Sequence, residues 1–188
     1  MRLDLVRHLP AHVAPGTCYG RSDVACAHAD PAALATYRAR LASAQVISSP
    51  ARRCADLARR LASDPRLDPR LLEIDFGRWE LQAFDAIDRA AIDAWAAAPW
   101  DFVPPDGESA SQMARRVVAA LDDILRLDAL HVVVVAHGGP LRVMLGTLLR
   151  APRAHWLGLA FEPGDVVSLD LDDADRGFAR MSLKPAGG

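Results

Sequence analysis

The feature that most constrains this 188-residue chain is a short apolar run over residues 131–136, which reads His-Val-Val-Val-Val-Ala. A strand that is apolar on both faces is typical of the centre of a sheet that helices cover on both sides. Apolar side chains at helical spacing precede it in residues 113–125 and follow it in residues 141–148. We therefore expect an α/β fold, a three-layer sandwich with a mostly parallel central sheet.

The same kinds of pattern place the other elements. Further strands are predicted at residues 3–6, 45–48, 70–75, 165–171 and 178–183, and further helices at residues 50–63 and 82–97. Ser49 and Pro50 fit the N-cap and first turn of the helix that follows them. Ser109 and Gln112 fit a capping box at the start of the long helix. No repeat or linker divides the chain, so we expect one domain over residues 1–188.

Composition excludes several classes of protein. A hydrophobic content of 51% with 24% charged residues excludes a disordered chain. The net charge of −2 predicts no nucleic-acid partner and no attraction to acidic membranes. The N-terminus is charged and lacks a long apolar run, so we expect neither a signal peptide nor a membrane anchor. The three cysteines fit neither a disulfide framework nor zinc spacing, which favours a reducing, cytoplasmic location.

Polar residues follow four of the predicted strands at the point where each strand ends. They are Arg7-His8, Ser49 to Arg53, Glu73, and His137-Gly138-Gly139. Because ligands bind at the carboxyl ends of the strands in open α/β sheets, we expect these side chains to converge on one site.

The residue types in this set suit phosphoryl transfer. A neutral imidazole can be the nucleophile and form a phosphohistidine. Guanidinium groups and a second histidine can hold the phosphoryl oxygens, and a protonated glutamate can donate to the leaving oxygen. The arginines supply the positive charge, so we expect no metal and no other cofactor.

Four segments in order carry a resemblance to a known family. They are Leu5-Val6-Arg7-His8, Ser48 to Cys54 (Ser-Ser-Pro-Ala-Arg-Arg-Cys), Glu73 to Glu80 (Glu-Ile-Asp-Phe-Gly-Arg-Trp-Glu), and Val135 to Gly139 (Val-Ala-His-Gly-Gly). Together they resemble the histidine phosphatase superfamily, which includes the cofactor-dependent phosphoglycerate mutases. The resemblance implies a phosphoglycerate mutase-like fold and a metal-independent phosphomonoesterase that acts through a phosphohistidine.

The resemblance also implies a role for each matching residue. His8 matches the nucleophile, Glu73 the proton donor, His137 the second histidine of the pocket, and Arg7 and Arg53 the phosphate clamps. Two departures concern the lining of the pocket: Leu9-Pro10 follows the nucleophile where the family has glycine, and Ala14 replaces an asparagine. Pro10 favours an extended conformation at Leu9.

One further stretch points to a substrate. Residues 16–23, Gly-Thr-Cys-Tyr-Gly-Arg-Ser-Asp, are similar to a loop of the alpha-ribazole phosphatases. This implies dephosphorylation of alpha-ribazole 5′-phosphate or a related cobalamin precursor, with Tyr19, Arg21 and Gly138 among the substrate contacts. The only partner expected is this small phosphomonoester, and the oligomeric state is not predicted.

Several alternatives stay open at this point. The chain could be a histidine phosphatase for another small phosphate ester, a phosphoglycerate mutase-like enzyme, or a catalytically silent protein that binds a phosphate ligand. Arg142 could contact substrate or be solvated. Glu108 could position substrate or be an acid favoured by the dipole at a helix start.

Overall fold

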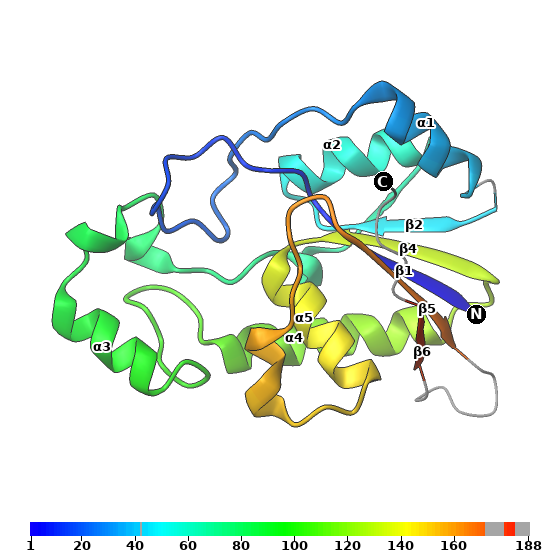
Figure 1. The fold of residues 1–188 in the computed structure, drawn as a ribbon. Helices are drawn as coiled ribbons and strands as arrows, with labels where there is room; N and C mark the ends of the chain where they lie inside the picture. Colours follow the sequence, from blue (N-terminus) through cyan, green and yellow to red (C-terminus); the bar gives the residue numbers. More distant parts are fainter. Residues whose placement is uncertain (42, 172–178, 183–188) are drawn as a thin grey trace.

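The computed structural model describes residues 1–41, 43–171 and 179–182, in which six strands form one sheet. In sheet order the strands are β3 (Arg66–Leu67), β2 (Gln45–Ser48), β4 (His131–Ala136), β1 (Arg2–Arg7), β5 (Val166–Leu171) and β6 (Ala179–Ser182). The first four run parallel, β5 is antiparallel to β1, and β6 is antiparallel to β5. The carboxyl ends of β1, β2 and β4 therefore meet at one edge (Figure 1).

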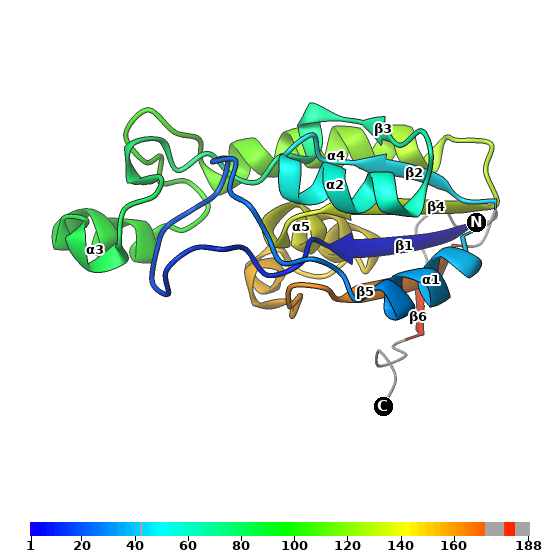
Figure 2. The ribbon, with the colours of Figure 1, turned by 90° about the horizontal axis from the view of Figure 1, so that it is seen from above.

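Helices cover both faces of the sheet, as the sequence predicts (Figures 1 and 2). The helices α1 (Pro31–Ala39) and α2 (Arg52–Leu61) lie on one face, and α4 (Ala110–Leu125) and α5 (Gly138–Leu148) on the other. The helix α3 (Arg89–Ala97) lies beyond the carboxyl ends of the parallel strands. The three-layer α/β architecture with a mostly parallel sheet is thereby confirmed.

The apolar run in β4 explains the layering. Val133 and Val135 pack into the core on the α2 side, whereas Val132 and Val134 pack into the core on the side of α4 and α5. All four are fully buried, because successive side chains of a strand point to opposite faces of the sheet. Both faces of β4 therefore need apolar side chains.

A third, smaller apolar cluster lies outside the sandwich. Trp79 stacks on Phe102 with ring centroids 5.4 Å apart, and Trp95 meets Trp79 edge to face. Buried Cys18 and Ile87 complete its centre. This cluster holds the irregular chain between residues 76 and 102 beside the loop of residues 16–23.

The predicted strand over residues 70–75 is wrong. The third strand is only β3, and the short 3₁₀ helix η1 (Pro69–Leu71) follows it. Asp68 is the reason, because its carboxylate accepts a hydrogen bond from the backbone N–H of Arg70 and caps that turn. Pro69 also lacks the N–H that a strand would need.

The starts of two predicted helices are also corrected. Helix α2 begins at Arg52 with Ala51 as its N-cap, because Ser49 Oγ lies 2.8 Å from His137 Nε2 instead of capping the helix. The pattern over residues 82–97 divides into the 3₁₀ helix η3 (Phe84–Ala86) and α3, with the Asp88 side chain capping α3. Ile87 is extended between them and interrupts the helix, so apolar spacing alone misplaces the boundary.

Helix α1 has no counterpart among the predicted helices. Asp30 caps it and Pro31 occupies its first turn, but none of its residues is buried. Only Leu34 and Tyr37 pack, partly buried, against the core, so its apolar stripe is too short to reveal a helix in the sequence. Within the described residues, no helix is both long and apolar enough to cross a membrane.

The other predicted elements are present. Ser109 and Gln112 form the capping box of α4, with side chain and backbone bonded in both directions. Helix α5 starts directly after β4, and β5 lies where the sequence places it. The strand expected near residues 178–183 is β6, although residues 178 and 183 themselves lie outside the described residues.

Candidate active site

His8 follows the last residue of β1 and is buried, with 2% of its surface exposed. Its Nδ1 lies 2.6 Å from the carbonyl oxygen of Leu9. Since a carbonyl only accepts, this contact assigns the ring proton to Nδ1 and leaves a lone pair on Nε2. Burial lowers the pKa of His8 to about 4, and the charges of Arg53 and Arg7 add to this effect. The imidazole is therefore neutral near pH 7.

Leu9 does not adopt the left-handed backbone conformation. It is absent from the described non-glycine residues with positive φ, namely Leu81, Asp106 and Arg150. The replacement of glycine by Leu9-Pro10 therefore introduces no left-handed backbone strain beside His8. Ala14 is exposed, and its carbonyl accepts a hydrogen bond from the Thr17 N–H.

His137 is the N-cap of α5 and is completely buried. Its ring centroid lies 5.2 Å from that of His8. Arg53 Nε donates to His137 Nδ1 over 3.1 Å, so the proton of the neutral ring lies on Nε2, which faces Ser49 Oγ. Burial, reinforced by Arg53, lowers the pKa of His137 well below its ordinary value. His137 can thus donate a hydrogen bond from Nε2 without carrying charge.

Arg53 joins His137 to the loop of residues 16–23. It is 1% exposed, and its guanidinium donates to the carbonyl oxygens of Gly20 over 2.6 Å and Ser22 over 2.7 Å. Its Cζ lies 5.6 Å from the centre of the Tyr19 ring. No carboxylate forms an ion pair with Arg53 among the described residues. A buried cation paired only with neutral groups suits an anionic ligand.

Arg7 provides a second guanidinium at the same place. One of its terminal nitrogens donates to the carbonyl oxygen of Phe161, but Nε has no partner. It is the only buried side-chain nitrogen or oxygen without a hydrogen bond in the described part of the chain. Since such a donor is costly to leave unpaired, a ligand oxygen is its natural acceptor.

Arg142, for which the sequence leaves a substrate contact open, lies beside Arg7 and is partly buried. A Cβ built on Gly138 would lie 2.9 Å from Arg142 Nη1 and 3.3 Å from Arg7 Cζ. Burial and the charge of Arg7 lower the pKa of Arg142. Both guanidinium groups therefore gather at the first residue of α5, where the helix dipole also favours an anion. A side chain at position 138 would displace the ends of both arginines.

Glu73 reaches the same helix end from an irregular segment. The sequence predicts that Glu73 ends a strand, and this is wrong because β3 ends at Leu67. Its Oε2 accepts from the Gly139 N–H over 3.0 Å and its Oε1 from the Ile74 N–H over 3.0 Å. A Cβ on Gly139 would lie 2.2 Å from Oε1, so glycine is what allows this carboxylate to approach.

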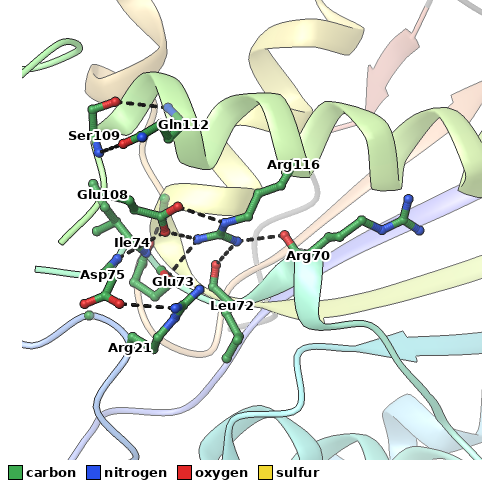
Figure 3. A network of polar contacts seen from close by, with 12 residues as sticks. Arg21, Arg70, Leu72, Glu73, Ile74, Asp75, Glu108, Ser109, Gln112 and Arg116 are labelled. Atoms are coloured by element: carbon green, nitrogen blue, oxygen red, sulfur yellow. Dashed lines mark hydrogen bonds and ion pairs between the residues drawn. The ribbon is translucent and has the colours of Figure 1, made fainter. Parts of the chain in front are cut away.

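Glu80 organises the loop of residues 16–23, a role that the sequence patterns do not indicate. Its carboxylate accepts from the backbone N–H groups of Gly20, Arg21 and Ser22 and from the Ser22 hydroxyl. Burial opposes its ionisation, but these bonds outweigh burial and lower the pKa of Glu80. Tyr19 is half-buried, whereas the Arg21 side chain is exposed and pairs with Asp75 over 3.1 Å (Figure 3).

The structure thus gathers five of the predicted residues around one point. His8, Arg7, Arg53, His137 and Glu73 meet at the ends of β1 and β4 and the start of α5. Arg21 is exposed and pairs with Asp75. Within the described residues, no group of three or more His, Cys, Asp or Glu side chains is placed to hold a metal ion.

Comparison with known proteins agrees with this arrangement. The family model for the histidine phosphatase superfamily (branch 1) matches residues 5–184. Among curated proteins, the bifunctional protein Rv2228c of Mycobacterium tuberculosis is 36% identical over 117 residues. That match covers 57% of this chain but only 32% of the relative, so this chain spans about a third of the relative's length.

Solved structures are similar over nearly their whole length. The mycobacterial glucosyl-3-phosphoglycerate phosphatase is 25% identical, with 96% of both chains covered and a TM-score of 0.78. An Escherichia coli protein assigned provisionally as an alpha-ribazole-5′-P phosphatase is 22% identical, with 97% of this chain and 95% of that chain covered and a TM-score of 0.81. At that identity the second likeness shows the fold alone.

Proposed function

The chain belongs to the histidine phosphatase superfamily, and on that premise we propose that it hydrolyses a small phosphate monoester through a phosphohistidine on His8. The observation that carries the proposal is the surplus of unpaired positive charge around a neutral imidazole. Arg7 Nε lacks a partner, and Arg53 is buried without a carboxylate. This arrangement suits a phosphoryl group better than a neutral ligand, because the guanidinium groups match its oxygens.

In the first step, His8 Nε2 attacks the phosphorus with its lone pair. A phosphorus–nitrogen bond forms while the ester phosphorus–oxygen bond breaks, and the bonding electrons stay on the leaving oxygen. A protonated Glu73 carboxyl gives that oxygen its proton. Arg7 and Arg53 stabilise charge on the equatorial oxygens. His137 orients Arg53 by accepting its Nε–H at Nδ1, while its own Nε2–H donates to Ser49 Oγ.

In the second step, water replaces His8. The Glu73 carboxylate takes a proton from the attacking water, and the new phosphorus–oxygen bond displaces the imidazole, which recovers its electron pair. Inorganic phosphate leaves, and Glu73 is protonated again for the next cycle. The guanidinium groups supply all the positive charge that these steps require, so the proposed mechanism uses no metal.

Labelling tests this proposal directly. Substrate phosphate should label the wild-type protein with an acid-labile bond, and His8→Ala should abolish both the label and turnover. Thermal unfolding of the variant confirms that it is folded. Label that survives in His8→Ala would refute His8 as the nucleophile.

For the substrate, we propose alpha-ribazole 5′-phosphate or a related nucleoside-like phosphate. The support is the loop of residues 16–23, which two hydrogen bonds tie to Arg53. Tyr19 lies beside that guanidinium and offers an aromatic ring with a polar tip to a ribose or a flat base. A phosphoglycerate-type ester is the second candidate, because Arg142 adds a guanidinium that could hold a carboxylate.

A substrate panel distinguishes these candidates. Alpha-ribazole phosphate should have a kcat/KM well above those of 3-phosphoglycerate and simple sugar phosphates. Tyr19→Ala should reduce this preference more than it slows hydrolysis of a nitrophenyl ester. A preference for phosphoglycerate esters that Arg142→Ala removes would favour the second candidate and overturn the first.

A further inference from the structure

The segment that carries Glu73 lacks the backbone support that a strand would give it. Strand β3 ends at Leu67, so residues 70–75 have no neighbouring strand to bond. Carbonyl and N–H groups there still need partners, because buried backbone groups are rarely left unpaired. Three of the carbonyl oxygens, those of Arg70, Leu72 and Glu73, share one partner, the side chain of Arg116 of α4 (Figure 3).

Arg116 uses all of its hydrogen-bond donors on this segment and on one carboxylate. A guanidinium has five N–H donors in a rigid fork. Nη1 donates to the carbonyl oxygens of Arg70 over 2.8 Å and Leu72 over 2.6 Å, and Nη2 to that of Glu73 over 3.0 Å. The other two donors, on Nε and Nη2, bind the two oxygens of Glu108.

Glu108 holds the same segment from the other side of Glu73, and Arg116 and Glu108 together form what we call the backbone clamp. Its Oε1 also accepts from the Asp75 N–H over 3.2 Å, so the pair grips the backbone on both sides of Ile74. The Arg116 and Glu108 side chains are only 17% and 16% exposed. The capping box that starts at Ser109 fixes the backbone next to Glu108.

The direction of the Glu73 side chain gives the backbone clamp a consequence for chemistry. The backbone of Glu73 is held against α4, while its carboxylate crosses to the Gly139 N–H at the start of α5. The carboxylate therefore occupies a defined place beside His137 only while the backbone is held. Glu108 is turned toward Arg116 and Asp75, which excludes it as a group aimed at His8.

We propose that Arg116, together with Glu108, is a positioning residue that holds Glu73 where it can protonate the leaving oxygen. The proposal rests on the proposed function of Glu73 as the general acid. Neither Arg116 nor Glu108 touches substrate. Their contribution is to keep the donor oxygen within hydrogen-bond reach of the leaving group, on which general acid catalysis depends. Lysine cannot replace Arg116, because it has three donors and no planar fork.

Leaving groups of different quality separate positioning from a merely structural role. Nitrophenolate departs without a proton, whereas an alkoxide needs one. Loss of Glu73 placement should therefore slow hydrolysis of glycerol 2-phosphate much more than that of p-nitrophenyl phosphate. The ratio of the two kcat/KM values does not depend on how much of a variant is folded, so a destabilised variant still gives a clear result.

The test uses Arg116→Lys and Glu108→Gln, with Asp123→Asn as the matched control. Asp123 is also a carboxylate on α4 that pairs with an arginine of the same segment, Arg70, over 2.7 Å, but it does not contact Glu73. Each test variant should lose about tenfold or more on glycerol 2-phosphate and less than about threefold on p-nitrophenyl phosphate. Asp123→Asn should leave the ratio unchanged. Equal losses on both esters in the test variants would overturn the proposal.

A double variant shows whether Arg116 acts through Glu73. If it does, Glu73→Gln with Arg116→Lys should lose no more on glycerol 2-phosphate than Glu73→Gln alone. Losses that multiply would overturn the positioning role while leaving Glu73 as the general acid. If Glu73→Gln itself showed no dependence on the leaving group, the proposed function of Glu73 would fail first, and the positioning role with it.

Discussion

At the scale of single residues, the site combines two neutral histidines with arginines that remain charged. Burial keeps His8 neutral and hence nucleophilic, while Arg53 binds the Nδ1 of His137 and so directs its ring proton to Nε2. The two rings therefore have opposite tautomers, one suited to attack and the other to donate. A single cation, Arg53, contributes to both effects.

The role of Glu73 leads to a prediction at this scale. Glu73→Gln keeps the size and one acceptor oxygen but cannot donate and then accept a proton. We expect kcat/KM for an alkyl phosphate to fall by about 100-fold or more, in line with general acid catalysis, and that for p-nitrophenyl phosphate to fall far less. Steady-state kinetics on both esters measure this, with Glu162→Gln as an exposed glutamate control. Similar losses on the two esters would argue against a proton transfer by Glu73.

Sequence patterns identify the residues of this site better than their supports. His8, Arg53, Glu73 and His137 follow recognisable motifs, and the structure brings them together. Ser49, Glu80 and Arg142 are harder to find, because their importance comes from partners far away in the chain. Glu80, for example, binds backbone groups about 60 residues earlier.

At the scale of elements, the loop of residues 16–23 is bonded to Arg53 of the proposed phosphate site. Glu80 accepts hydrogen bonds from N–H groups of the loop, and Arg53 donates to carbonyl oxygens of the same loop. The position of Arg53 therefore depends on the position of Glu80. Gly20 lies where the loop packs tightly against the backbone of Ile74. A Cβ there would lie 2.0 Å from the carbonyl oxygen of Ile74.

Two glycine variants in this loop should therefore differ. Gly20→Ala should displace the carbonyl that holds Arg53 and lower kcat/KM on every ester by about tenfold or more. Gly16→Ala meets open space, and its φ of +77° brings only backbone strain, which costs about 1 kcal/mol. We expect Gly16→Ala to unfold at lower temperature yet keep nearly full activity. Kinetics and thermal unfolding of both variants check this, and equal activities would show that the loop does not position Arg53.

Elements with an apolar stripe are predictable, and the others are not. The buried runs in β4 and α4 leave a clear period in the sequence, and both elements are where it places them. Helix α1 packs only the partly buried Leu34 and Tyr37 against the core, and the segment of residues 70–75 is held by Arg116 instead of by a sheet. Support that comes from one distant side chain leaves no periodic signal, so a strand is predicted there wrongly.

At the scale of the whole molecule, the charged side chains of the candidate site lie at the edge of the apolar core. The core lies on both faces of the sheet, and the polar side chains of the candidate site gather at the carboxyl ends of β1 and β4. Fold class follows from the sequence, because one doubly apolar strand demands two helical layers. That residues 1–188 form a single domain stays a prediction.

Burial of the two histidines should make the stability of the whole protein depend on pH. Both have pKa values below those of an exposed histidine, so the unfolded chain binds protons that the folded chain does not. Over the pH range in which the unfolded chain binds more protons than the folded chain, the free energy of unfolding rises with pH and falls as the pH is lowered. For His8 this window extends from the ordinary value of 6.5 down to about 4. Above it both states are neutral and His8 makes no difference.

A variant that lacks the His8 imidazole should lose less stability in acid than the wild type. From the two pKa values of His8, going from pH 7 to pH 5 should cost the wild type about 2 kcal/mol that His8→Gln does not lose. Urea unfolding of both proteins at the two pH values gives the difference, in which the titration of other groups largely cancels. His12→Gln is the matched control, because His12 is an exposed histidine, and its difference from the wild type should stay constant. If His8→Gln lost as much stability in acid as the wild type, burial would not be what keeps the nucleophile neutral.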